Sequence, residues 1–209
     1  MLKAEGLVQN HKKTERIYYS HGLQLKKRRP KRKVYKPENP LPPLVKANSR
    51  WSLDFAHDNL AGGRAFRILT IIDEWTRESP AMEVDTSLSG QRVVKVLERL
   101  KLDRGVPEEI GVDQGPGFIS KALTKWAADN GVRLHYASSG NKNENAFIES
   151  YNGRRRDECL NMHWFSNLKD AREIIEEWRI DYNQCRPHTS LGGMTPKKFA
   201  ESKGLRLVS

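Results

Sequence analysis

The sequence predicts a mixed α/β domain, with a five-stranded sheet flanked by helices, preceded by a basic and partly helical N-terminal arm. Two observations support this prediction. Beyond residue 50, strand-like segments come first three in a row and then alternate with helical segments. Before residue 46, basic residues and prolines dominate instead. We therefore expect residues 1–46 to be a helical segment with a basic, proline-rich linker, and residues 47–209 to be the folded domain.

The N-terminal arm carries most of the positive charge. The chain has a net charge of +11, and residues 1–46 contain 13 Lys or Arg against 3 Asp or Glu. Residues 1–23 read as mostly helical, and five of the ten prolines fall between Pro30 and Pro43, which is typical of an extended linker. Such a local excess of charge favours a polyanion as partner.

One run of this arm has seven basic residues in eight positions. It would bind DNA phosphates without sequence preference, and this binding would weaken as salt rises because bound counterions are released. The alternative is a solvated linker. The candidate DNA-binding residues of this run are Lys26, Lys27, Arg28, Arg29, Lys31, Arg32 and Lys33.

Five segments have the composition of strands. In the first, Trp51, Leu53 and Phe55 alternate with Ser52, Asp54 and Ala56, which places Asp54 at an outward, polar position. The others are short runs rich in apolar residues. The expected strands cover residues 51–56, 66–72, 81–85, 110–112 and 132–136. Their order in the sheet does not follow from the sequence pattern.

Helical periodicity and end signals predict five helices in the domain. Ser89 is a candidate N-cap for a helix that ends near Arg104 and has Val93, Leu97 and Leu100 on one face. The last helix opens with proline at its first position. The expected helices cover residues 89–104, 120–130, 145–160 and 167–183, with a short one from residue 195.

The composition also excludes some classes of protein. No segment approaches the roughly 20 consecutive apolar residues that a membrane span needs, and the N-terminus lacks the apolar stretch of a signal peptide. The two cysteines, Cys159 and Cys185, are far apart, so we expect buried thiols and neither metal ligands nor a disulfide. These features fit a protein of a reducing cytoplasm with no membrane partner.

Three acidic residues are the candidate metal ligands. Asp54 lies within the first strand, Asp113 follows the strand at 110–112, and Glu149 lies early on a helix, with 35 residues between Asp113 and Glu149. Two divalent ions can activate a nucleophile and neutralise charge on a phosphate, and Mg²⁺ prefers oxygen ligands. On spacing alone, bland roles are favoured: Asp54 as an exposed edge residue, Asp113 as a turn former and Glu149 as a charge in the first turn of a helix.

The residues around these acids resemble a known family, the OrfB-type insertion-sequence transposases of bacteria, which belong to the retroviral-integrase catalytic core (DDE) family. The likeness spans about residues 47–200, and residues 1–35 resemble the end of the small helical region that precedes the core. The matching motifs lie at residues 51–55, 72–78, 113–118, 145–161, 181–183, 186–188 and 191–196.

This resemblance implies an RNase H-like fold and metal-dependent DNA cleavage and strand transfer, with water and then a DNA 3′-OH as nucleophile. It implies Mg²⁺ or Mn²⁺ as cofactor, held by Asp54, Asp113 and Glu149 as catalytic residues. The implied partners are the DNA of the element ends and of the target, and a second copy of the chain on that DNA. The implied location is the bacterial cytoplasm, at the nucleoid through DNA. Whether a small helix-turn-helix partner protein is required stays open.

Four further residues are candidate DNA contacts. Asn152 and Arg156 share a helix face with Glu149, so they could contact phosphates beside the metal site; the alternative is a solvated polar stripe. Lys142 and Arg154 could also contact phosphates, and a solvated role is an equally weighted alternative for both. A fourth acid, Asp73, is expected to be structural and paired with Arg77.

The sequence departs from the family at three places. Gln114 stands where the family usually has Asn, Gly117 stands where it usually has an acidic residue, and residues 139–142 replace its usual Pro-Gly-Lys-Pro loop. These departures bear on turnover more than on metal binding. The alternative function is therefore a truncated, non-catalytic DNA-binding remnant that regulates transposition.

Overall fold

Five strands form one sheet in the order β3-β2-β1-β4-β5. The computed structural model describes residues 10–23, 43–137 and 146–204. Within the sheet, β1 pairs antiparallel with β2 and parallel with β4, while β3 and β5 form the two edges. The predicted five-stranded mixed sheet is confirmed, and the structure adds the strand order. The strands are β1 (Arg50–Asn59), β2 (Ala65–Asp73), β3 (Ala81–Asp85), β4 (Glu109–Val112) and β5 (Arg133–Tyr136).

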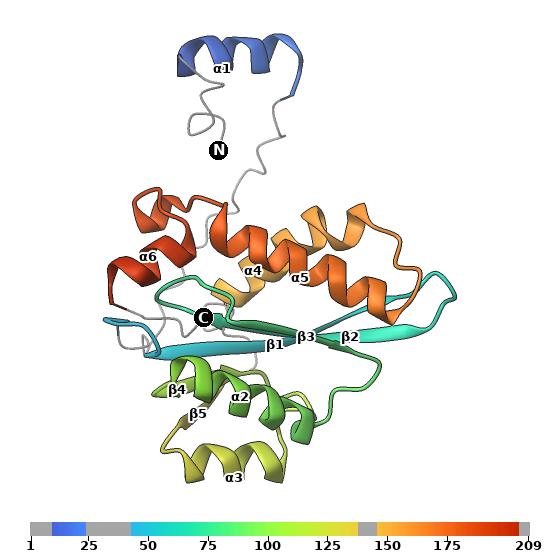
Figure 1. The fold of residues 1–209 in the computed structure, drawn as a ribbon, viewed down its shortest axis with the longest axis vertical. Helices are drawn as coiled ribbons and strands as arrows, with labels where there is room; N and C mark the ends of the chain where they lie inside the picture. The colour runs from blue at the N-terminus through green and yellow to red at the C-terminus, as the bar shows by residue number, and fades with distance from the viewer. Residues whose placement is uncertain (1–9, 24–42, 138–145, 205–209) are drawn as a thin grey trace. The chain divides into compact units, whose positions relative to one another are not determined.

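Helices cover both faces of the sheet (Figure 1). Helices α2 (Gly90–Arg104) and α3 (Lys121–Asp129) lie on one face. The opposite face carries α4 (Ala146–Glu158), α5 (Leu168–Gln184) and α6 (Pro196–Ser202). Short 3₁₀ turns, η1 and η2, occupy Leu160–Met162 and Thr189–Leu191.

Side-chain caps begin these helices where the sequence predicts. The Ser89 hydroxyl accepts from the N–H of Arg92 at 3.4 Å, and the Ser120 hydroxyl accepts from the N–H of Leu123 at 3.2 Å. Asn167 and Thr195 cap α5 and α6 in the same way. Each cap satisfies a backbone donor that the first helical turn leaves without a partner.

The contacts within the chain divide it into two units, residues 1–40 and 41–209. The described part of the first unit holds one helix, α1 (His11–Ser20), which Asn10 caps by accepting from the N–H of Lys12 at 3.0 Å. None of the residues of α1 is buried. The basic run at residues 26–33 lies outside the described residues.

Helices cover both faces of the sheet and Asp54 is half-buried, so its predicted outward position is wrong. Trp51 and Leu53 of β1 pack in a cluster with α2 and α3, together with Leu97 and Trp126. On the other face, β2 and β3 contribute Phe66, Ile68 and Val84 to a second cluster under α4 and α5. Asp54 therefore meets α4 through Asn152, whereas His57 and Asn59, further along β1, are exposed.

Helices α2 and α3 approach each other closely at their N-termini. A Cβ at Gly90 would lie 2.1 Å from the Ser120 hydroxyl oxygen and 2.5 Å from the Ser120 Cβ. Only glycine fits there without movement of the neighbouring chain. The cap of α3 thereby rests directly on the first residue of α2.

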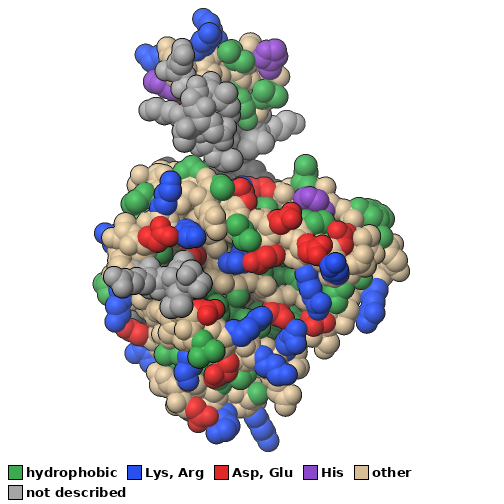
Figure 2. Space-filling model, viewed as in Figure 1, with side chains coloured by type: hydrophobic (Ala, Val, Ile, Leu, Met, Phe, Trp, Pro, Cys, Tyr) green, Lys and Arg blue, Asp and Glu red, His purple; other side chains and the backbone are tan. Residues whose placement is uncertain are grey.

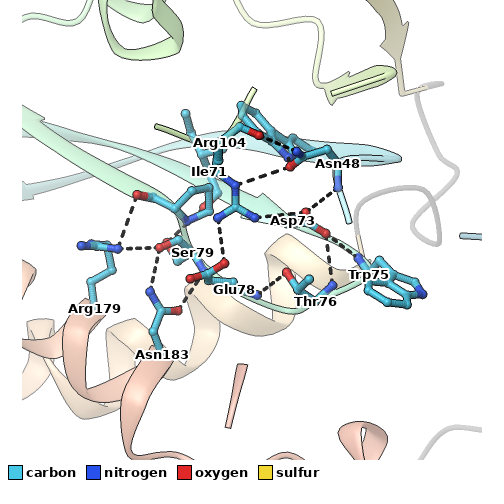
Figure 3. A network of polar contacts seen from close by, with 12 residues as sticks. Asn48, Ile71, Asp73, Trp75, Thr76, Glu78, Ser79, Arg104, Arg179 and Asn183 are labelled. Atoms are coloured by element: carbon cyan, nitrogen blue, oxygen red, sulfur yellow. Dashed lines mark hydrogen bonds and ion pairs between the residues drawn. The ribbon is translucent and has the colours of Figure 1, made fainter. Parts of the chain in front are cut away.

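Asp73 is structural, as expected, but its ion-pair partner is Arg104 rather than Arg77 (Figure 3). The Asp73 side chain is fully buried and accepts from the backbone N–H groups of Asn48, Trp75 and Thr76. Arg104, the last residue of α2, also bonds to Glu78 at 2.7 Å. This network joins the end of β2 to the end of α2.

The edge strand β3 is covered by arginines of α5. Arg172 Nε donates to the carbonyl of Val84 at 2.8 Å, and Arg179 Nη1 donates to the carbonyl of Ser79 at 2.7 Å. Asn183 of α5 also bonds to Ser79, through both its amide nitrogen and its amide oxygen (Figure 3). Side chains of the same chain thus satisfy carbonyls along and just before this edge.

The two cysteines differ from each other. Both are free; Cys159 is buried, as predicted, and Cys185 is exposed, which contradicts the prediction of two buried thiols. Cys185 follows the last residue of α5, where the helix ends at the surface. Among the described helices, none is long and apolar enough to cross a membrane.

Candidate active site

The pairing of β1 with β4 brings two of the predicted acids together. These parallel strands are aligned with Trp51 opposite Ile110 and Ser52 opposite Gly111. Asp54 lies two residues after Ser52, and Asp113 lies two residues after Gly111, just past the end of β4. Because parallel strands advance by the same rise per residue, the two carboxylates emerge side by side. The charge of Asp113 accordingly acts on Asp54.

Asp54 lies in an unfavourable environment for a charge. Burial raises the pKa of its carboxyl above the ordinary value, and the neighbouring charge of Asp113 raises it further. Hydrogen bonds from the Phe55 N–H and from Asn152, and the positive charge of Arg155, act in the opposite direction. The ionised form of Asp54 would therefore gain from an added positive charge nearby.

Helix α4 lies over Asp54 and carries the third acid. Asn152 Nδ2 donates to Asp54 Oδ2 at 2.5 Å, which ties the helix to β1. Glu149 precedes Asn152 by three residues and so lies on the same side of α4 one turn earlier. Asn152 was predicted to contact DNA, and the structure places its amide on Asp54.

The segment after Asp113 is held in a tight turn. The Gly115 N–H donates to Asp113 Oδ1 at 2.9 Å. A Cβ at Gly115 would lie 2.8 Å from the same oxygen, so glycine lets the backbone approach the carboxylate. Asp113 is exposed, and this turn fixes its direction.

The same segment explains one departure from the family pattern. Phe118 stacks on Phe55, with ring centroids 4.4 Å apart. A Cβ at Gly117 would lie 2.5 Å from the Phe55 ring. The aromatic ring occupies the space that a side chain at position 117 would need, so an acidic residue does not fit this packing.

Arg155 is a residue that the sequence analysis missed. Its side chain is 1% exposed, and its guanidinium donates to the Thr70 hydroxyl beneath α4. Burial lowers its pKa, while the charge of Asp54 is among the influences that raise it. The spacing of Ile148, Tyr151, Arg155 and Cys159, three then four then four, predicts a buried helix face and could have identified it.

Comparisons with known proteins agree with this arrangement. The Integrase core domain family matches residues 45–142 and again residues 130–196. The insertion element IS407 uncharacterized 31.7 kDa protein of Burkholderia multivorans is 42% identical over 200 residues, covering 96% of this chain and 72% of the relative. The chain belongs to the insertion-sequence transposases of the integrase core (DDE) family.

Other relatives of this transposase family support the assignment. The insertion element IS476 uncharacterized 39.2 kDa protein of Xanthomonas euvesicatoria is 40% identical over 200 residues, covering 96% of this chain and 58% of that protein. The putative transposase InsK for insertion sequence element IS150 of Escherichia coli is 26% identical over 214 residues, covering 95% of this chain and 74% of that protein.

Solved structures confirm the RNase H-like fold of this family member. An intasome of simian T-cell lymphotropic virus gives a TM-score of 0.68 at 15% identity, over 83% of this chain and 61% of that chain. The HTLV-2 integrase catalytic core domain in complex with magnesium gives 0.59 at 17% identity, over 75% of this chain and 98% of that chain. At such low identity, the likeness concerns the fold alone.

The donor set beneath α4 fits a divalent cation. Asp54 and Asp113 offer carboxylate oxygens whose charges repel each other, and Asn152 Oδ1 is buried without a hydrogen-bond partner among the described residues. Hard cations prefer such oxygen donors. Within residues 10–23, 43–137 and 146–204, however, no three His, Cys, Asp or Glu side chains are grouped closely enough to hold an ion. Glu149 lies on the helix that contacts Asp54, but the described side chains do not group it with Asp54 and Asp113.

The remaining predicted DNA contacts divide between the two sides of α4. Arg156 lies seven residues after Glu149, on the same side, and is exposed. Arg154 is also exposed but lies on the opposite side of the helix. Lys142 and the basic run at 26–33 fall outside the described residues.

The surface of the core unit carries both signs of charge. On the face drawn in Figure 2, acidic and basic side chains of residues 41–209 are interspersed. This agrees with the sequence, in which residues 1–46 account for +10 of the net +11. The family member therefore has no broad basic surface on this face of its core.

Proposed function

We propose that this chain catalyses metal-dependent DNA cleavage and strand transfer at the ends of an insertion sequence. Asp54, Asp113 and Glu149 would hold Mg²⁺ or Mn²⁺. The observation that carries the proposal is the pair of adjacent carboxylates, Asp54 and Asp113, with Asp54 bonded to the helix that bears Glu149. Membership of the transposase family supports a role for this pair in DNA cleavage and strand transfer.

The reaction consists of two displacements at phosphorus. In the first, the oxygen of water bonds to phosphorus and the bond to the 3′ oxygen breaks, which leaves a free 3′-OH. In the second, that 3′-OH attacks a target phosphodiester and displaces its 3′ oxygen. Divalent ions in such a site supply Lewis acidity and a lowered pKa for the attacking water or hydroxyl.

The chain's own residues would orient the ligands for this chemistry. Asn152 holds Asp54 through the bond at 2.5 Å, and the Gly115 N–H holds Asp113 at 2.9 Å. The positive charge of Arg155 favours the ionised form of Asp54. These contacts prepare both carboxylates before the ion and the DNA arrive.

The proposed partners are DNA and further copies of the chain. Element ends and target DNA would both bind, with the basic arm adding attraction that does not depend on sequence. The HTLV-2 integrase core domain is described in trimeric and dimeric forms, which supports an oligomer for this chain on DNA. We place this activity at the bacterial nucleoid.

A first test measures metal binding without DNA. We expect Mg²⁺ and Mn²⁺ to raise the Tm of the wild-type chain, because a ligand that binds only the folded state stabilises it. Asp54→Asn and Asp113→Asn should abolish this shift. Asp54→Asn should also raise the Tm of the metal-free protein, because it removes a buried charge that Asp113 repels. An unchanged metal response in either variant would remove that residue from the ligand set.

A second test measures strand transfer on labelled duplexes that carry the element's ends. We expect joined products with Mg²⁺ or Mn²⁺, none with EDTA, and none with Asp54→Asn, Asp113→Asn or Glu149→Gln. Asp129→Asn on α3 and Glu177→Gln on α5 are the matched controls, being exposed acids far from the site in sequence. DNA binding with neither joining nor a metal response would instead identify a regulatory remnant.

A further inference from the structure

A polar pocket lies between α4 and the segment that follows α5. Its volume is about 510 Å³. We call it the basic pocket; it is lined by Arg154, Arg186, Pro187, His188, Thr189 and Ser190. Arg154 comes from α4, and the other five residues are consecutive. The metal site and the reaction described above use none of them.

The segment that forms one wall of the pocket is rigidly built. The His188 N–H donates to the carbonyl of Met194 at 2.9 Å, and the His188 carbonyl accepts from Leu191 and Gly193. Gly192 and Gly193 have φ values of 65° and 80°, a conformation that favours glycine. These bonds close the turn and fix the position of His188.

His188 contributes a mostly buried side chain to the lining of this pocket. The residue is 8% exposed, and its Nε2 is buried without a hydrogen-bond partner among the described residues. Burial, followed by the charges of Arg154, Arg186 and Arg77, lowers the pKa of His188 to about 4. The ring is therefore neutral near pH 7, with one nitrogen that donates and one that accepts. A buried polar atom without a partner is costly, which favours a polar ligand beside it.

The guanidinium groups around His188 give the pocket a positive charge. Arg186 forms a two-pronged pair with Glu158, one bond being 2.7 Å, so a single carboxylate neutralises one arginine. Burial raises the pKa of the Tyr182 side chain and the positive charge of Arg154 acts to lower it, so the guanidinium lies near that hydroxyl. The hydroxyls of Thr189 and Ser190 complete the lining. With the Arg186 fork engaged by Glu158, the Arg154 guanidinium and the nearby hydroxyls are the groups that suit a phosphate oxygen.

The pocket lies on a different side of α4 from the acids. Arg154 follows Glu149 by five residues, and at about 100° per residue the two side chains point about 140° apart around the helix axis. A helix with its side chains is about 10 Å across. A phosphate in the basic pocket would thus be separate from the phosphate that reacts.

We propose that the basic pocket binds a backbone phosphodiester of the DNA substrate away from the bond that is cut. DNA would then contact both sides of α4, the reacting phosphate near Glu149 and a second phosphate near Arg154. This inference rests on the proposed function, because it takes the substrate of that function as its ligand. The pocket positions the duplex and takes no part in bond making.

The test is equilibrium binding of a fluorescent DNA duplex to the full chain in EDTA, over a series of salt concentrations. Each phosphate contact contributes about 0.9 to the magnitude of the slope of log K against log salt. At about 0.1 M salt, one such contact therefore raises the affinity on the order of tenfold. We expect Arg154→Gln to weaken binding by on the order of tenfold and to lower the slope by about one. His188→Gln should weaken binding with little change in slope, because the ring is neutral.

Lys101→Gln is the matched control, being an exposed basic residue on α2 outside the pocket. The Tm of each variant shows whether it folds, and Arg154 is exposed, so its loss should leave the fold intact. Wild-type affinity and slope for Arg154→Gln, with strand transfer intact, would overturn the pocket and leave the proposed function standing. Weakened binding in Arg154→Gln, with no strand transfer by the wild type, would support the pocket and overturn the proposed function.

Discussion

The two thiols of this chain lie in opposite environments, although the sequence predicts both as buried. Cys159 is fully buried among α4, η1 and the second core cluster, and burial raises its pKa to about 11. Cys185 is exposed at the end of α5. The thiolate is the reactive form, so exposure and pKa both decide how fast a cysteine is alkylated.

We therefore predict that iodoacetamide at pH 8 modifies Cys185 rapidly in the native protein and leaves Cys159 intact. Cys159 should react only after denaturation, because its thiol is both covered and protonated at that pH. Peptide mapping by mass spectrometry distinguishes the two sites. Rapid native modification of Cys159 would contradict its burial beneath α4.

Single residues were predicted well where their neighbours in sequence decide their role. The three acids were identified by the residues around them, and their assignment as ligands stays a prediction. Arg155 was missed because a charged residue is read as exposed, whereas its place in the helical repeat puts it beneath α4. Gly117 was read as a departure, and only the packing of Phe55 explains it.

At the scale of elements, two glycines of similar appearance in the sequence have opposite roles. Gly153 lies inside α4, with nothing within 4 Å of the position of a Cβ. Gly90 begins α2, where a Cβ would meet Ser120 at 2.1 Å. Glycine costs a helix interior up to about 1 kcal/mol relative to alanine, whereas overpacking costs about 1–3 kcal/mol.

We predict that Gly153→Ala raises the free energy of unfolding by about 0.5–1 kcal/mol. Gly90→Ala should lower it by about 1–3 kcal/mol, because Ser120 belongs to the cap of α3 and cannot move freely. Urea unfolding followed by circular dichroism measures both. Equal effects of the same sign from the two substitutions would refute the close approach of α2 and α3.

The helices and strands were predictable because their signals are local. Ser89, Ser120, Asn167 and Thr195 are all N-caps in the structure, as polar residues before apolar periodic segments should be. The order of the strands was not predictable, since pairing β1 with β4 joins residues about 60 positions apart on the basis of packing and register. That pairing is also what brings Asp54 to Asp113.

At the scale of the whole domain, stability depends on a buried ion network that joins distant segments. Arg104 of α2 pairs with Asp73 at 3.3 Å and with Glu78 at 2.7 Å, and all three side chains are almost fully buried. Asn48, before β1, bonds to both ends of this network. Removing one partner leaves buried charge without compensation.

We predict that Arg104→Met lowers the free energy of unfolding by about 3–5 kcal/mol, because Asp73 and Glu78 lose their shared partner. Lys125→Met is the control: it removes an exposed pair with Asp129 and should cost at most about 1 kcal/mol. Denaturant titration measures both variants. Similar small losses from the two would show that the network contributes little to folding.

The candidate site was only partly predictable at this scale. The sequence singled out three acids but could not show whether they converge. The fold brings Asp54 and Asp113 together, and among the described residues Glu149 is not grouped with them. The basic pocket was not predictable, since Arg154 and His188 meet only when α4 and α5 pack side by side.

The arginines along β3 have a consequence for how copies of this chain behave when crowded. An exposed outer strand is a template on which a foreign strand can hydrogen-bond and start an aggregate. Here Arg172 and Arg179 already engage carbonyls along and just before that strand. An incoming strand would have to displace two charged side chains, so self-association by sheet extension is disfavoured at this edge.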